Sequence, residues 1–127
     1  MADNTLGMNG VASKGVCVKD SASQVNNAIA SFTDVVELTI SRSAGSGYEL
    51  TLVLENSDRA GTKLECSDVS NLTIAEFGGG LTQFLCLRAE DVRSAQLDRV
   101  ALRFSDLERG TIAFYCSAAT VKRVQIL

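Results

Sequence analysis

Residues 100–116, Val-Ala-Leu-Arg-Phe-Ser-Asp-Leu-Glu-Arg-Gly-Thr-Ile-Ala-Phe-Tyr-Cys, contain two runs in which apolar and polar side chains alternate. The apolar positions are Val100, Leu102 and Phe104 in the first run and Ile112, Phe114 and Cys116 in the second. A period of two is typical of a strand that buries one side. Asp106 and Gly110 between the runs favour a turn. The stretch therefore predicts a β-hairpin with one apolar face.

The same alternation recurs upstream. Residues 36–42 and 48–55 flank a glycine-containing turn at 44–47 and predict a second hairpin. Its inward side chains include Leu50, Leu52 and Leu54. Residues 63–66 and 72–74 continue the pattern with a change of phase that indicates a bulge or a bend.

The remaining apolar runs predict further strands. Residues 84–90 are apolar on both sides at first and predict a central strand, whereas 15–19 predict a short one. A polar connection at 91–98 has the spacing of a helical turn through Val92 and Ala95. Val121, Val124 and Ile126 extend a final strand.

One helix is predicted, and it begins at Ser21. The Ser21 side chain can cap the first turn, and Gln24 stands three residues later in the capping-box position. Val25, Ile29 and Phe32 follow on one apolar stripe, which predicts a helix of about three turns. The side chains expected to face away from this stripe are Asn26, Asn27 and Ser31.

These elements predict a single β-rich domain over residues 1–127, with residues 1–35 as an N-terminal arm and helix. Short turns between successive strands favour antiparallel pairing. We expect a mainly β fold (β-rich α+β), an antiparallel β-sandwich or curved sheet of about six to eight strands with one N-terminal helix.

Composition narrows the function classes. A net charge of −3 disfavours a nucleic-acid binder, which normally carries a basic stripe to neutralise phosphates. No run reaches the ~20 apolar residues of a membrane helix. The first four residues lack the basic and apolar regions of a signal peptide, which favours a cytoplasmic protein without membrane association.

The four cysteines, Cys17, Cys66, Cys86 and Cys116, form no CxxC pair, and the chain has no histidine. A structural zinc site, two disulfides and buried free thiols are the alternatives. Cys66 is in phase with Leu64, and Cys116 lies on the apolar face of the last run. This placement favours buried thiols without a metal or cofactor, because cysteine behaves as a small apolar residue.

Catalytic patterns are weak. Without histidine, the Ser-His-Asp and Cys-His arrangements are excluded. The carboxylate pairs Asp106/Glu108 and Glu90/Asp91 are sequence neighbours, whereas a glycosidase pair comes from opposite sides of a cleft. Gly45-Ser46-Gly47 and Gly78-Gly79-Gly80 are not followed by the Lys and Ser/Thr of a phosphate loop. The sequence therefore favours a protein that is not an enzyme.

Binding residues are predicted on the polar side of the last hairpin and on exposed tyrosines, which often anchor interfaces. The predicted partner-binding residues are Tyr48, Arg103, Asp106, Glu108 and Tyr115, with Arg109 beside them. Because these side chains are expected to face outward, we expect alanine substitutions at Asp106, Glu108 and Tyr115 to leave stability nearly unchanged.

Several segments carry a resemblance to known proteins. They are Ile40-Ser41-Arg42-Ser43, Tyr48-Glu49-Leu50-Thr51-Leu52, Ser70-Asn71-Leu72, Glu76-Phe77-Gly78-Gly79-Gly80 and residues 103–116. On these segments the chain resembles a group of small bacterial β-rich proteins, some of which are similar to immunity proteins of polymorphic-toxin systems. The likeness covers about residues 36–118 and is most specific in the last segment. It implies binding and neutralisation of a cognate toxin domain, and it assigns no functional residue.

The leading hypothesis from the sequence is a non-enzymatic protein-binding module, an immunity protein acting as a monomer or homodimer. It would cover a toxin's active site with an acidic or aromatic surface, and opposite charge on the toxin would speed association. The alternative is a small-ligand-binding or structural β-domain that uses the concave side of its sheet. A carboxylate enzyme ranks third.

Overall fold

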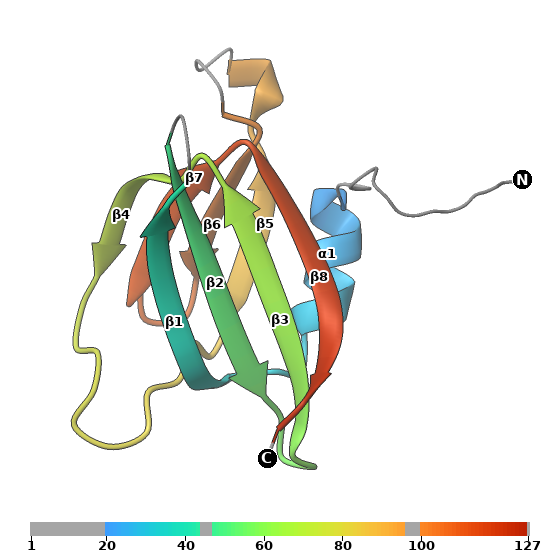
Figure 1. Ribbon diagram of the computed structural model, residues 1–127, viewed down its shortest axis with the longest axis vertical. Helices are drawn as coiled ribbons and strands as arrows, with labels where there is room; N and C mark the ends of the chain where they lie inside the picture. The colour runs from blue at the N-terminus through green and yellow to red at the C-terminus, as the bar shows by residue number, and fades with distance from the viewer. Residues whose placement is uncertain (1–19, 44–46, 96–99, 127) are drawn as a thin grey trace, which may run out of the picture.

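The computed structural model describes residues 20–43, 47–95 and 100–126, and it shows two antiparallel four-stranded sheets (Figure 1). The first sheet has the order β1-β2-β3-β8 and the second the order β4-β7-β6-β5. The strands are β1 Asp34–Arg42, β2 Tyr48–Glu55, β3 Ala60–Ser67, β4 Ser70–Ile74, β5 Leu87–Asp91, β6 Leu102–Asp106, β7 Ile112–Cys116 and β8 Ala118–Gln125. The predicted mainly β, antiparallel fold is confirmed.

The last hairpin forms as its pattern predicts, with β6 and β7 paired around Phe104 opposite Phe114. Their rings stack at a centroid distance of 5.0 Å and an interplanar angle of 12°. In the turn, the Gly110 N–H donates to the Asp106 carbonyl at 2.9 Å. Gly110 has φ +66°, a value that glycine adopts without steric cost.

The core lies between the inner faces of the two sheets. Alternate residues of β2, β3, β6 and β7 point into it, which is the packing that a period of two requires. The largest fully buried side chains are Phe84, Phe104, Phe114, Leu50, Leu52, Leu54, Leu64, Ile112, Val25, Thr62, Cys66 and Cys116. The predicted inward leucines of β2 are therefore confirmed.

The phase change after residue 66 is the place where the chain leaves the first sheet for the second. Asp68 and Asn71 there both have φ +53°, and the pairing of β4 with β7 shifts register between Ser70 and Thr73. The prediction is confirmed: the chain bends at Asp68, and the register shift in β4 is a bulge. The helical turn predicted after residue 91 is also present, as the 3₁₀ turn η1, Arg93–Ala95.

Helix α1, Ala22–Ile29, begins with the predicted capping box. The Gln24 N–H donates to the Ser21 hydroxyl at 3.2 Å, and the Ser21 N–H donates to the Gln24 side chain at 2.8 Å. The helix is shorter than the predicted three turns. The Phe32 N–H donates to the Ile29 carbonyl, which tightens the last turn before β1 begins at Asp34. Phe32 is still buried.

Helix α1 closes one side of the sandwich, where it contacts β5 and β8 (Figure 1). Asn26 bonds the edge of β5 twice, donating to the Ala89 carbonyl at 2.9 Å and accepting from its N–H at 2.7 Å. Asp20 also bonds β8 twice, since its backbone N–H donates to the Ala119 carbonyl at 2.9 Å and its carboxylate accepts from the Val121 N–H at 2.8 Å. The prediction that Asn26 faces away was wrong, because its amide replaces a missing neighbouring strand.

Residues 84–90 do not form a central strand as predicted. Only the second half of this segment belongs to β5, which is an edge strand of the second sheet. Phe84 is buried through the preceding connection, which pairs with the start of β1 through an Asp34–Gln83 bridge. The apolar run is thus divided between the connection that pairs with β1 and the edge strand β5. The strand predicted at 15–19 and most of the turn at 44–47 lie outside the described residues.

Replacing Phe114 with alanine should lower the free energy of unfolding by roughly 3–5 kcal/mol, because it removes a fully buried ring and the stacking partner of Phe104. Leu107→Ala is the matched control, since Leu107 is 66% exposed and its truncation should change stability by less than about 0.5 kcal/mol. Urea unfolding followed by fluorescence or circular dichroism measures both. Equal losses for the two variants would contradict this core assignment.

Candidate functional site

Four large apolar side chains are exposed at one end of the sandwich. They come from the 75–86 connection and from the β6–β7 turn, and they are Phe77, Leu81, Leu85 and Leu107, with exposed fractions of 50%, 66%, 42% and 66%. We call these four side chains the apolar end. Figure 1 shows the connection after β4 extending well beyond the end of β4 before it turns back to join β5.

Asp106 fastens the two segments of the apolar end together. One carboxylate oxygen accepts from the N–H groups of Cys86 and Glu108 at 3.1 and 3.2 Å, and the other accepts from the Thr111 hydroxyl at 2.7 Å. The Leu107 N–H also donates to the Cys86 carbonyl at 2.9 Å. Leu85 and Leu107 are thus neighbours of backbone groups that are bonded to each other.

The predicted outward orientation of Asp106 was wrong, because its side chain is 3% exposed. It follows Leu102 and Phe104 on the inner face of β6. The turn that comes next leaves N–H groups that need an acceptor, and the carboxylate supplies it. Burial alone would raise the pKa of Asp106, but the hydrogen bonds from Thr111, Cys86 and Glu108 outweigh it and lower that pKa.

The 75–86 connection is anchored on both sides of its exposed part. The Ala75 N–H donates to the Thr111 carbonyl, and the Val35 N–H donates to the Thr82 carbonyl, each at 2.9 Å. Between them, the Gly78 N–H donates to the Thr82 hydroxyl. Gly79 has φ +72° and nothing within 4 Å of an added Cβ, so glycine is needed there for backbone conformation rather than for space. The anchors hold Phe77 and Leu81 outward.

Charged side chains flank the apolar end. Glu76 precedes Phe77 and lies 3.9 Å from the Arg109 guanidinium, with both groups largely exposed. Glu108 follows Leu107 and is exposed. Two carboxylates against one guanidinium give this end a slightly acidic rim.

The other predicted binding residues are divided between the two sheets. Arg103 and Tyr115 face each other across β6 and β7 on the outer face of the second sheet, with the guanidinium 5.9 Å from the ring centroid. The Arg103 side chain also donates to Ser105. Tyr48 belongs to the first sheet, where it is 51% exposed. The structure therefore unites Arg103 with Tyr115 and places Glu108 beside the apolar end.

Sequence reasoning missed the four residues of the apolar end. Leu107 stands in a turn between charged residues, and Phe77 and Leu81 flank three glycines. Apolar side chains in a turn or a glycine-rich loop have no strand or helix period that would bury them. That mismatch was the available signal.

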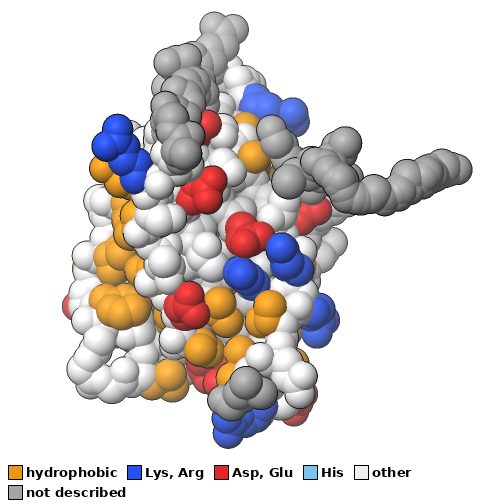
Figure 2. All heavy atoms as spheres, in the orientation of Figure 1, with side chains coloured by type: hydrophobic (Ala, Val, Ile, Leu, Met, Phe, Trp, Pro, Cys, Tyr) orange, Lys and Arg blue, Asp and Glu red, His pale blue; other side chains and the backbone are white. Residues whose placement is uncertain are grey.

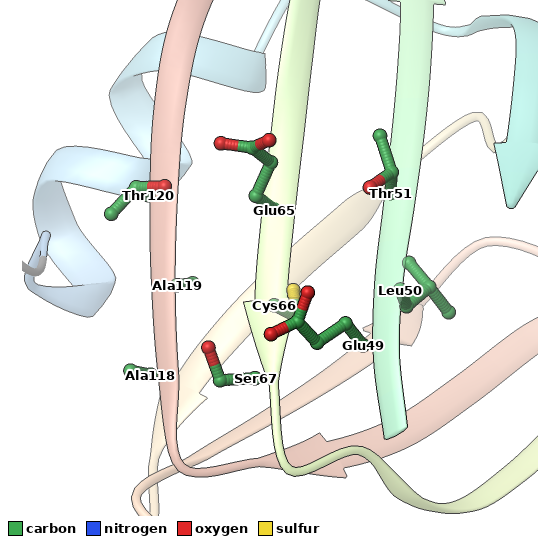
Figure 3. Close-up of a pocket in the computed structure, with 9 residues that line it drawn as sticks. All are labelled: Glu49, Leu50, Thr51, Glu65, Cys66, Ser67, Ala118, Ala119 and Thr120. Carbon is green, nitrogen blue, oxygen red and sulfur yellow. The ribbon is translucent and has the colours of Figure 1, made fainter. Parts of the chain in front are cut away.

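The outer face of the first sheet carries a shallow depression of about 200 Å³. Figure 3 shows the carboxylates of Glu49 and Glu65 there with the hydroxyls of Thr51, Ser67 and Thr120. Glu65 is paired with Lys122 at 3.1 Å and with Lys63 at 3.6 Å, and Figure 2 shows acidic and basic side chains intermixed on this face. The volume is below the roughly 300–1,000 Å³ of typical ligand pockets.

Cys66, Cys86 and Cys116 are free thiols, and Cys17 lies outside the described residues. Burial raises the pKa of the Cys66 thiol, and its contact with the Cys116 thiol across the core raises it further. Among the described residues, no group of three or more Cys, Asp or Glu side chains is arranged to hold a metal ion.

No protein-family model, no curated protein and no solved structure matches this chain. Within the described ranges, no helix has the length and apolar character needed to cross a membrane. The resemblance to immunity proteins stays a prediction.

Asp106→Ala should lower the free energy of unfolding at neutral pH by roughly 1–3 kcal/mol, because buried N–H groups lose their acceptor. The folded-state pKa of Asp106 is lowered relative to an unfolded value of about 3.9. Its contribution is therefore present above that pH and is lost as the pH falls through the folded-state pKa. Urea unfolding at pH 7 and at a series of acidic pH values measures both effects.

Glu108→Ala is the control for this experiment, since it removes an exposed carboxylate from the same turn. It should leave stability and its acid dependence nearly unchanged. Equal stability of the two variants at pH 7 would contradict a structural role for Asp106.

Thiol labelling should follow burial. In a Cys17→Ser variant, the half-buried Cys86 should react with a maleimide at least roughly tenfold faster than Cys66 and Cys116, because the side chains of Cys66 and Cys116 are buried and out of reach of the reagent. After denaturation without any reducing agent, the Cys17→Ser variant should give three reactive thiols. The unmodified chain should give four. Mass spectrometry of the labelled peptides measures this. Missing thiols or recovered zinc would refute the free-thiol assignment.

Proposed function

We propose that this chain is a non-enzymatic protein-binding module whose partner docks on the apolar end. The observation that carries the proposal is the exposure of Phe77, Leu81, Leu85 and Leu107 on segments held by named hydrogen bonds. Exposed apolar patches on a soluble domain often mark protein interfaces. Loops positioned by a rigid scaffold are also where binding residues concentrate.

Energetics favour this surface over the Arg103–Tyr115 pair. Fully burying one leucine or phenylalanine gains roughly 1.5–3 kcal/mol, and a few such anchors dominate a typical interface. Because Asp106 and the Thr82 contacts already fix the backbone, little ordering entropy is lost on binding. Arg103 and Tyr115 instead satisfy each other on a polar face.

The partner in this proposal is a toxin domain, and the chain acts as its immunity protein in the cytoplasm. The resemblance over about residues 36–118 supports this class. The acidic rim at Glu76 and Glu108 and the net charge of −3 fit a partner whose active-site cleft is basic. Opposite charges would steer association, and the apolar end would fill the cleft mouth and exclude substrate.

The test is titration calorimetry of this chain with a candidate toxin domain, taken from a secreted toxin encoded by a neighbouring gene. Leu81→Ser and Leu107→Ser should each weaken binding by roughly tenfold or more, as anchor truncations do. Their melting temperatures should stay near that of the unmodified protein, since both side chains are 66% exposed.

A variant carrying Arg103→Ala and Tyr115→Ala is the matched control, because it removes the pair predicted from the sequence and leaves the apolar end intact. It should bind with nearly unchanged affinity. Loss of binding in this variant, with none in the leucine variants, would move the interface to the outer face of the second sheet. Absence of binding by the unmodified protein would refute the toxin assignment.

A further inference from the structure

The four edge strands of the sandwich differ in whether other residues bond their free backbone groups. The edges of β8 and β5 are bonded by Asp20 and Asn26, as described above. Strand β4 has five residues and an irregular register with β7, which makes it a poor template for pairing. Strand β1 has nine residues and a continuous register with β2 from Glu37 to Arg42. It is the long regular edge among the described strands.

Hydrogen bonds fix which groups of β1 face its free edge. The Ser43 N–H donates to the Gly47 carbonyl, so these two residues form a hydrogen-bonded pair of the β1–β2 hairpin. Such pairs alternate along an antiparallel ladder. The N–H and C=O groups of Leu38, Ile40 and Arg42 therefore point away from β2. No described residue bonds them on that edge.

The chain itself shows that this edge accepts an antiparallel strand. Residues 82–84 lie along its first residues, where the Val35 N–H donates to the Thr82 carbonyl and the Phe84 N–H donates to the Thr33 carbonyl, each at 2.9 Å. These bonds end before Leu38. The rest of β1 continues the same edge, and none of residues 20–43, 47–95 and 100–126 bonds it there.

We propose that a second copy of this chain pairs its own β1 antiparallel with this edge, with a two-fold axis at Ile40. In this register Ile40 faces Ile40 of the second copy, and Leu38 faces Arg42. Every outward N–H and C=O of Leu38, Ile40 and Arg42 then gains a partner. The first sheet of one copy and the first sheet of the other then form one continuous sheet.

Side chains support this register. Ile40 is 46% exposed and is the central apolar residue of the edge, so the pairing buries it against its own copy. Glu37 faces Ser43 and Thr39 faces Ser41, so no like charges stand opposite each other. Strand β1 of the second copy also ends at Arg42, opposite Leu38, so it stops before it would reach Val35, which is already bonded to Thr82. The contact is isologous and closed.

A contact confined to one edge strand is small, which is typical of weak and concentration-dependent association. Sedimentation velocity over a series from micromolar to millimolar protein should show the mass of the unmodified chain doubling. Ile40→Lys should remain monomeric throughout, because it places two ammonium groups opposite each other. Leu107→Lys, which adds the same charge at the apolar end, should dimerise like the unmodified chain.

Amide hydrogen exchange gives a second readout that does not depend on a variant. The amides of Leu38, Ile40 and Arg42 should exchange quickly in dilute protein and more slowly as concentration rises, whereas the Thr39 amide, which faces β2, should be protected throughout. A monomer at all concentrations, or dimerisation of Ile40→Lys, would overturn the proposal. This surface is separate from the apolar end, so either proposal can fail alone.

Discussion

The backbone groups at the sheet edges are the constraint on which the rest of this structure depends. A four-stranded sheet leaves an unpaired row of N–H and C=O groups on each outer strand, and burying such groups without partners is costly. The Asp20 carboxylate accepts a hydrogen bond from β8, and the Asn26 amide both donates to and accepts from β5. They bring α1 over the opening between those strands, where Val25 and Ile29 complete the core.

The opposite side of the sandwich is closed differently, and this difference places both candidate surfaces. Residues 82–84 bond the first part of β1, and this contact ends the excursion that exposes Phe77 and Leu81. Asp106 then ties the end of the same connection to the β6–β7 turn, which exposes Leu107. The path of the 75–86 connection therefore determines both the apolar end and the part of β1 that residues 82–84 leave unbonded.

For the polar side chains predicted to bind a partner, the alternation of the strand gave the right orientation, but the role assigned to one of them was wrong. Alternation in β6 places Arg103 outward and Phe104 inward, as the structure has them. The same alternation places Asp106 inward, but its charge and its turn position suggested an exposed site. A carboxylate can be buried where several donors meet it, and those donors come from Cys86 and Thr111, outside its own strand.

The sequence alone determined the local elements: the capped helix at Ser21, the two hairpins, and the inward faces of β2, β6 and β7. Their periods and turn residues act over a few neighbouring positions, so they can be read without knowing the fold. Tertiary structure decided which strands became edges, the change of sheet at Asp68, the role of Asn26 and the exposure of Leu81 and Leu107. These depend on hydrogen bonds between residues far apart in the chain, such as Asn26 with Ala89, and no local pattern encodes such pairings.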